Sequence, residues 1–232
     1  MSGMQNLSAT NAAGVLLDLS AVLILLLAFA CLGSKLFNRY VAYYGAQSVV
    51  LSLAAGVAAY AFRSVELWVL AVLTLAIKGI GIPVLARRLL VQRLDLKRDA
   101  ALSTGLSTSL IAGGALTAFA YLVTKPQQLL PHGVAHGVVA AAVVPLSTAV
   151  ILLGGLAMVV RRHTVAQLIG WLIVENGVFL GAITLVATFP FIVEAGIFLD
   201  IVAGVLIMLV FVSGLTRRLA SASAAELREL QG

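Results

Sequence analysis

The fold class is indicated most clearly by residues 165–188, VAQLIGWLIVENGVFLGAITLVAT. This stretch is long and apolar and has one ionisable residue, Glu175. A helix needs about 20 apolar residues to cross the hydrocarbon core of a bilayer. The stretch lacks the alternation of polar and apolar residues that a lipid-facing barrel strand requires. Backbone groups in lipid must bond to one another, so the stretch predicts a transmembrane helix with a carboxyl group near its middle.

Six further apolar stretches of comparable length extend this prediction to most of the chain. They are residues 12–33, 41–62, 66–88, 100–123, 133–159 and 191–215. Hydrophobic residues make up 62% of the 232 residues and charged residues 10%, whereas a soluble domain is about a quarter charged. The sequence therefore predicts an all-α, polytopic membrane helix bundle of about seven transmembrane helices in the cell (inner or plasma) membrane.

The basic residues between these stretches predict the orientation. Two basic residues, Arg63 and Lys125, follow even-numbered spans. Twelve follow odd-numbered spans: Lys35, Arg39, Arg87, Arg88, Arg93, Lys97, Arg98, Arg161, Arg162, Arg217, Arg218 and Arg228. Because short cytoplasmic loops carry the excess of Lys and Arg, we expect an external N-terminus and a cytoplasmic C-terminus.

Composition also excludes several classes of protein. The net charge of +6 comes from few basic residues diluted among apolar ones, which excludes a nucleic-acid-binding domain. Cys31 is the only cysteine, so the chain alone forms neither a disulfide scaffold nor a cysteine-ligated iron–sulfur site. We expect no cofactor, no metal and no catalytic centre in this chain.

Four ionisable residues fall inside predicted spans: Asp18, Lys78, Glu175 and Asp200. Each costs about 2.5–3.5 kcal/mol at the centre of a membrane helix on insertion scales, so each requires an explanation. At about 1.5 Å of rise per residue, Lys78, Glu175 and Asp200 lie near the midplane, and Asp18 lies closer to the outer surface. Such a layer favours lateral proton movement through Glu175, Asp200 and Lys78. The alternatives are a static ion pair that fastens the bundle and, less favoured, a substrate-binding site.

Local sequence supports a working site at Lys78 and Glu175. Pro83 cannot donate to the Gly79 carbonyl, so a kink is expected just after Lys78, where a freed carbonyl can hold water. Gly177 and Gly181 follow Glu175 at a spacing that permits close helix contact.

Other polar residues are candidate accessories to the path. Asp18, Gln47 and Glu194 belong to this group, although a membrane Gln is more often interhelical glue. His136 lies four residues after His132 at the outer start of a span, where capping or packing is favoured over a metal site.

The order of spans suggests an internal organisation. Residues 1–99 form an N-terminal three-helix unit with a cytoplasmic connector, and residues 100–132 form a linker helix and outer loop. Residues 133–216 form a second three-helix unit, followed by a cytoplasmic tail at 217–232.

Four segments carry a family resemblance. They are residues 44–51 (YGAQSVVL), 77–89 (IKGIGIPVLARRL), 169–180 (IGWLIVENGVFL) and 191–208 (FIVEAGIFLDIVAGVLIM). They resemble the hydrogenase-4 component E family, membrane subunits of formate hydrogenlyase-type complexes, over nearly the whole chain. Residues 133–216 are also similar to the three-helix K subunit of respiratory complex I. Lys78 and Glu175 match charged positions of these families, and Asp200 stands where a Glu is expected.

The resemblance implies a set of partners. These are antiporter-like and other membrane subunits of one complex, and a peripheral arm holding iron–sulfur clusters and nickel–iron or a degenerate form of it. The chain would then be a non-redox, K-like subunit of an oxidoreductase complex that carries part of a proton or cation translocation path. Two alternatives stay open: a scaffold that bridges antiporter-like modules, and a small stand-alone permease.

Overall fold

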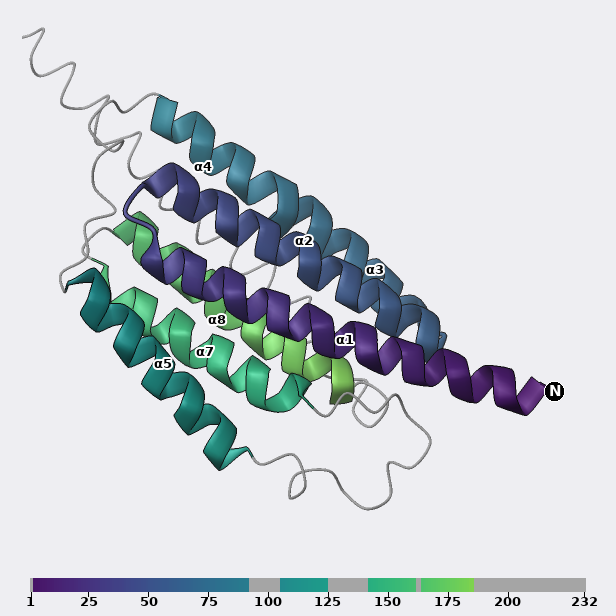
Figure 1. Cartoon of the computed structure of the whole chain (residues 1–232). Helices are drawn as coiled ribbons and strands as arrows, with labels where there is room; N and C mark the ends of the chain where they lie inside the picture. Colours follow the sequence, from purple (N-terminus) through teal and green to yellow (C-terminus); the bar gives the residue numbers. More distant parts are fainter. Residues whose placement is uncertain (1, 92–104, 125–141, 162–163, 186–232) are drawn as a thin grey trace, which may run out of the picture.

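The computed structural model describes residues 2–91, 105–124, 142–161 and 164–185, and its elements are all helices (Figure 1). In chain order they are α1 (Ser2–Gly33), α2 (Phe37–Phe62), α3 (Val65–Thr74), the π-helix η1 (Leu75–Gly81), α4 (Ile82–Val91), α5 (Leu106–Val123), α7 (Val143–Val160) and α8 (Thr164–Leu185). The all-α prediction is confirmed for the described part of the chain.

Six stretches of the described chain are long and apolar enough to cross a membrane, and they correspond to the first six predicted spans. The first, Ala12–Gly33, has the predicted limits, whereas the second begins at Phe37 rather than at residue 41. The earlier start follows from packing, because Phe37 and Tyr40 are buried in the core. The predicted seventh span, residues 191–215, lies outside the described residues. These helices are those of a multi-pass membrane protein.

The third span, Val65–Arg87, is one continuous helix assembled from α3, η1 and the start of α4. The backbone N–H of Ile82 donates to the carbonyl of Ile77, five residues earlier, as in a π-helix. From Pro83 the sequence predicted a kink just after Lys78. The structure shows a π-helix that begins at Leu75, includes Lys78 and ends two residues before Pro83.

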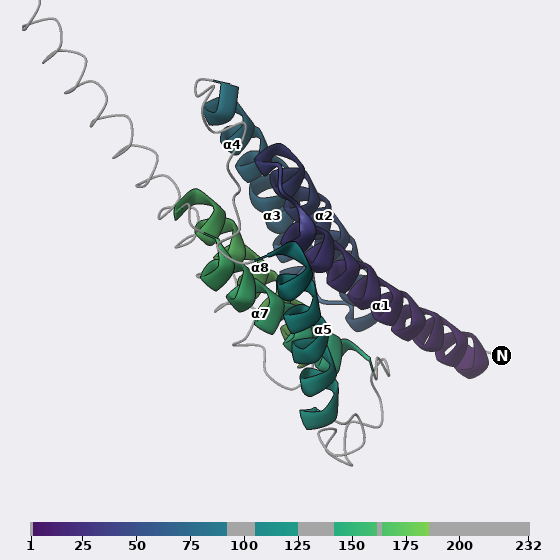
Figure 2. The same cartoon turned by 60° about the vertical axis from the view of Figure 1, so that its left-hand side comes forward.

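The helices pack side by side as a bundle (Figure 2), and α2 contacts more of the other elements than any other helix of the described chain. Helix α2 contacts α1, α3, η1, α4 and α8, and α7 contacts α1, α5 and α8. Helix α2 therefore joins the N-terminal helices to α8.

Glycines allow α7 and α8 to approach closely. A Cβ atom placed on Gly177 would lie 2.9 Å from the backbone nitrogen of Ile151, and one on Gly181 would lie 2.9 Å from Ser147 Oγ. On the facing helix, a Cβ on Gly154 would lie 2.6 Å from the backbone nitrogen of Val174. The close contact predicted from the Gly177 and Gly181 spacing is confirmed, and it fixes the part of α8 that carries Glu175.

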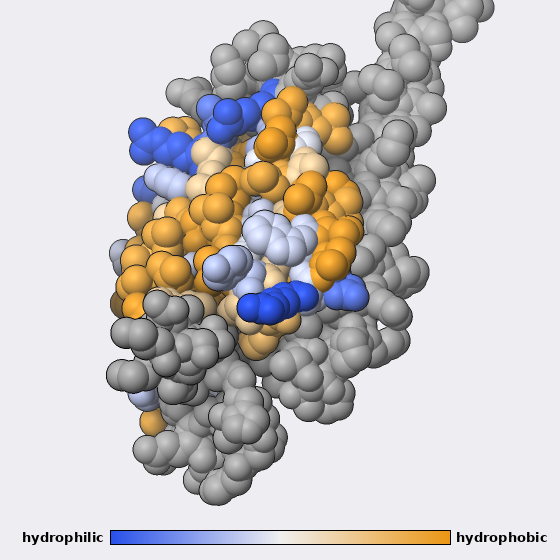
Figure 3. Space-filling model, turned by 90° about the vertical axis from the view of Figure 1, so that its right-hand side faces the viewer, coloured by the Kyte–Doolittle hydropathy of each residue, from blue (hydrophilic) through white to orange (hydrophobic). Residues whose placement is uncertain are grey.

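The outer surface is mainly apolar, as a lipid-facing surface must be. Figure 3 shows hydrophobic residues over most of the described surface in that view. Along α3 the exposed residues include Val65, Trp68, Val69 and Val72.

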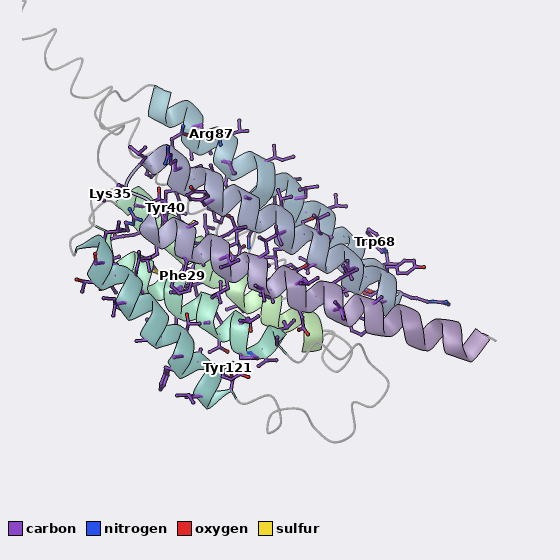
Figure 4. The ribbon with its side chains drawn as sticks, in the orientation of Figure 1. Phe29, Lys35, Tyr40, Trp68, Arg87 and Tyr121 are labelled. Carbon is purple, nitrogen blue, oxygen red and sulfur yellow. The ribbon has the colours of Figure 1, made fainter. Side chains whose placement is uncertain are left out.

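Lys35 and Arg87 lie toward one end of the bundle and Trp68 and Tyr121 toward the other (Figure 4).

Candidate functional site

The centre of the bundle contains a buried ion pair. The Nζ atom of Lys78 lies 3.3 Å from Oε2 of Glu175, and the two side chains are 1% and 6% exposed. Lys78 belongs to η1 and Glu175 to α8, so the pair joins helices that are distant in sequence. The structure thus brings together two of the three residues predicted to form the proton path.

Both residues lie about halfway along their helices. At about 1.5 Å per residue, Lys78 is about 14 Å from Arg87, and Glu175 is about 17 Å from Thr164. Each span is about as long as the hydrocarbon core is thick, so the pair lies near the middle of the apolar layer. A charge there is costly unless it is paired, and the contact between Lys78 and Glu175 supplies the partner.

Close packing positions the π-helix against α2. A Cβ placed on Gly45 would lie 2.9 Å from Cγ of Pro83, and one on Gly79 would lie 3.2 Å from Cγ2 of Val49. These glycines let α2 approach the chain closely just after Lys78. The π-helical geometry therefore occurs where η1 contacts the centre of α2.

Hydrogen-bonded polar side chains lie next to the ion pair along the sequence. The amide nitrogen of Asn176 donates to Oε1 of Gln47 and to Oγ of Ser48, each at 3.2 Å. Gln47 in turn donates to the carbonyl of Ile24 at 3.1 Å, which ties α8, α2 and α1 together. Gln47, Ser48 and Asn176 have no exposed surface. We call these three residues the amide cluster.

One buried hydrogen-bond acceptor in the amide cluster is not satisfied by the described residues. Among the described residues, no hydrogen-bond donor lies against Oδ1 of Asn176, although the side chain is fully buried. Buried acceptors in proteins are nearly always satisfied by a protein group or an ordered water. The cluster and the neighbouring ion pair therefore make this part of the bundle polar.

Gln47, a predicted accessory residue, is an interhelical link in this cluster. Its side chain both donates to α1 and accepts from α8. Asn176 and Ser48 were not singled out from the sequence. The only available signals were that Asn176 follows Glu175 and that Ser48 follows Gln47.

Asp18, another predicted accessory residue, lies at the N-terminus of α7. Its Oδ1 atom accepts a hydrogen bond of 3.0 Å from the backbone N–H of Ala142, the residue before α7. A carboxylate at this position satisfies a helix N–H group and interacts favourably with the helix dipole. This contact gives Asp18 a structural function.

Asp200, Glu194, His132 and His136 lie outside the described residues, and their predicted roles stay predictions. Within the described ranges, no three His, Cys, Asp or Glu side chains form a group that could hold a metal ion.

A second buried cation, Arg161, lies at the end of α7. Its Nη2 atom donates to the carbonyls of Cys31 at 2.9 Å and Leu32 at 3.2 Å, near the C-terminus of α1. The guanidinium carbon lies 4.5 Å from the centre of the Tyr40 ring, and the Tyr40 hydroxyl donates to the carbonyl of Ala166.

The sequence placed Arg161 among the loop residues that set the orientation. The structure buries it, with 1% of its surface exposed. Burial lowers the pKa of the guanidinium, and electrostatic interactions with Tyr40 and Cys31 oppose that change. Capping α1 is therefore the role that its contacts support, in addition to its place at the basic end of the bundle.

Comparisons with known proteins give one informative match. The uncharacterized protein Rv0085 of Mycobacterium tuberculosis is 32% identical over 157 residues, which cover 68% of this chain and 69% of that protein. No protein-family model and no solved structure matches the chain. Identity at this level, over more than two thirds of both proteins, shows common descent, and the chain belongs to the same protein family as Rv0085.

Proposed function

We propose that the chain is a non-redox membrane subunit of an oxidoreductase complex and carries part of its proton path. Glu175 is the proton-carrying carboxyl group in this proposal, and Lys78 is the charge partner that controls its protonation. Asp200 is proposed as the second carrier. In the proposed orientation, the N-terminus lies outside the cell and the C-terminus lies in the cytoplasm.

The observation that carries the proposal is the contact between Lys78 and Glu175. Two groups that can each gain or lose a proton are 3.3 Å apart in the centre of an apolar bundle. Two ionisable groups at this distance interact strongly, so the protonation of one depends on the charge of the other. A neighbouring charge that arrives or leaves can therefore shift the balance and move a proton.

The surroundings of the pair add support. The π-helix at Lys78 departs from regular α-helical hydrogen bonding, and such segments occur frequently at functional sites. The amide cluster places polar groups beside Glu175 in sequence and at similar depth.

The partners follow from the resemblance to hydrogenase-4 component E and to the complex I K subunit. In this proposal, antiporter-like membrane subunits flank the chain, and a peripheral redox arm supplies the energy.

The basic residues Lys35, Arg39, Arg87 and Arg161 occur at the helix ends opposite Arg63, which supports the orientation.

A scaffold function is the second candidate, and the same contact favours it. A buried ion pair can be static, and removing one partner from such a pair typically costs about 3–5 kcal/mol. A scaffold of this kind would need Lys78 and Glu175 for stability and assembly, but proton movement would not pass through them.

The first experiment separates a complex subunit from a stand-alone permease. The tagged chain is purified from its native membranes in mild detergent. A co-purifying set of membrane and redox subunits supports the proposal. A chain that purifies alone and transports ions after reconstitution contradicts it.

The second experiment tests the proton path. Inverted membrane vesicles containing wild-type, Glu175→Gln or Lys78→Ala complexes are energised in turn with formate, hydrogen and NADH. Dye quenching reports proton uptake, and substrate consumption reports turnover. Loss of proton uptake in variants that still assemble supports the path. Unchanged uptake and turnover in both variants rules it out.

Matched controls identify the scaffold outcome. The double variant Lys78→Met/Glu175→Gln removes both charges of the pair together, so neither charge of the pair is left without the other. If it restores assembly and also restores proton uptake, the pair is structural. If it restores assembly without proton uptake, the pair belongs to the path.

A further inference from the structure

A groove lies beside the turn between α1 and α2, at the end of the bundle that carries Lys35. Its volume is about 600 Å³. The lining combines two basic side chains, Lys35 and Arg39, with apolar groups from Ala30, Leu36 and Leu106. These residues come from α1, the α1–α2 turn, α2 and α5.

The polar part of the groove is suited to an anion. Lys35 and Arg39 are exposed, and no acidic side chain is among the described residues that line the groove. Helix α2 also begins here, and its N-cap residue, Leu36, has no side chain that accepts from the first N–H groups. The positive end of the helix dipole therefore adds to the two side-chain charges.

The apolar part continues into the membrane-spanning region. Ala30 lies within the Ala12–Gly33 span, and Leu106 begins the Leu106–Val123 span. A small soluble anion would contact only the charged part of this groove. An anion carrying hydrocarbon chains would contact both parts.

Helix α5 is the element that gains most from such a ligand. Its span is 17% buried within the bundle, the lowest share among the six spans of the described chain. The buried residues of α5 are Ser109, Gly113 and Ala120. A ligand held between Leu106 and the α1–α2 turn would add contacts at the end of α5.

From this combination we propose that the groove binds an anionic phospholipid of the phosphatidylglycerol or cardiolipin class. The phosphate lies between Lys35 and Arg39, and the acyl chains follow α1 and α5 into the bilayer. Basic pockets between membrane helices are a known way of recognising such headgroups. The proposal is independent of the proton path.

The test is lipid binding to the full-length protein, alone or within its complex, measured by native mass spectrometry. Dioleoyl phosphatidylglycerol, dioleoyl phosphatidylcholine and inorganic phosphate are compared as ligands. Lys35→Gln/Arg39→Gln removes the two groove charges. Arg63→Gln/Arg87→Gln is the matched control, because it removes two exposed charges elsewhere. Ala30→Phe fills the apolar part without changing charge.

We expect Lys35→Gln/Arg39→Gln to weaken phosphatidylglycerol binding about 30-fold, or about five- to sixfold for each basic residue. Ala30→Phe also weakens it, and the control pair binds as wild type does. Phosphatidylcholine and phosphate bind weakly to every variant. Equal binding of phosphatidylglycerol to the groove variant and the control overturns the proposal. So does phosphatidylcholine binding as tight as that of phosphatidylglycerol, or tight binding of phosphate alone.

Discussion

Lys78 and Glu175 are 97 positions apart in the sequence, and their charged atoms meet at 3.3 Å in the centre of the bundle. One residue lies in a π-helix and the other in the helix that glycines hold closely against α7. The pair is therefore held by backbone packing on both sides.

Removing one member of the pair should destabilise the protein more than removing both. Glu175→Gln removes the carboxylate that contacts the Lys78 ammonium, at an expected cost of about 3–5 kcal/mol, because breaking a buried ion pair is unfavourable. Lys78→Met/Glu175→Gln should recover most of that loss. Thermal unfolding in detergent measures both effects. A double variant that is no more stable than Glu175→Gln would show that the two charges are not coupled.

Asp18 should act as a helix cap and not as a proton carrier. Asp18→Asn keeps an oxygen that accepts from the Ala142 N–H, so stability and proton uptake should stay close to wild type. Asp18→Ala loses the cap, at a cost of about 1 kcal/mol. Vesicle proton uptake and thermal unfolding are compared for both variants. Loss of proton uptake in a stable Asp18→Asn protein would instead place Asp18 on the path.

Gly154 and Gly155 are adjacent on α7 and provide a matched pair. Gly154→Ala should destabilise the bundle by about 1–3 kcal/mol, because the added methyl group would meet the backbone of α8. Gly155→Ala should be tolerated, since nothing lies within 4 Å of its added Cβ. Equal melting temperatures for the two variants would contradict the close approach of α7 and α8.

Arg161 should contribute to stability through the end of α1. Arg161→Met removes two hydrogen bonds to the carbonyls of Cys31 and Leu32, each worth about 1.5–3 kcal/mol when the donor is charged. Arg161→Lys keeps the charge but loses the planar geometry, so its stability should be intermediate. Arg87→Gln removes an exposed cation and should leave the melting temperature unchanged. An Arg161→Met protein as stable as Arg87→Gln would refute the capping role.

The helices were largely predictable because membrane burial leaves a strong signal. Apolar stretches of about 20 residues predicted the first six spans, and the Gly177 and Gly181 spacing predicted a close helix contact, which the structure shows to be with α7. The shared depth of Lys78 and Glu175 also followed from their positions along their helices. Depth narrows the possible partners of a charge, but it does not determine which helices are adjacent.

The remaining features depend on three-dimensional contacts. From hydropathy, Arg161 is a loop residue. Hydropathy does not show that its guanidinium donates to a carbonyl at the end of α1. Pro83 predicted a kink, but it did not predict the π-helix, which begins eight residues before the proline. The bond between Asn176 and Gln47 joins positions 129 residues apart, and neither residue indicates the other.

An infrared titration of Glu175 in the assembled complex tests directly whether this carboxyl group exchanges a proton. Difference spectra are recorded across the neutral pH range for wild type and Glu175→Gln, and the C=O stretch of a protonated carboxyl group is followed. We predict a band that changes with pH in the wild type, is altered by Lys78→Met and is missing in Glu175→Gln. If the wild-type and Glu175→Gln spectra show the same bands while the wild-type complex translocates protons, Glu175 does not exchange a proton and the proposed path through it is wrong.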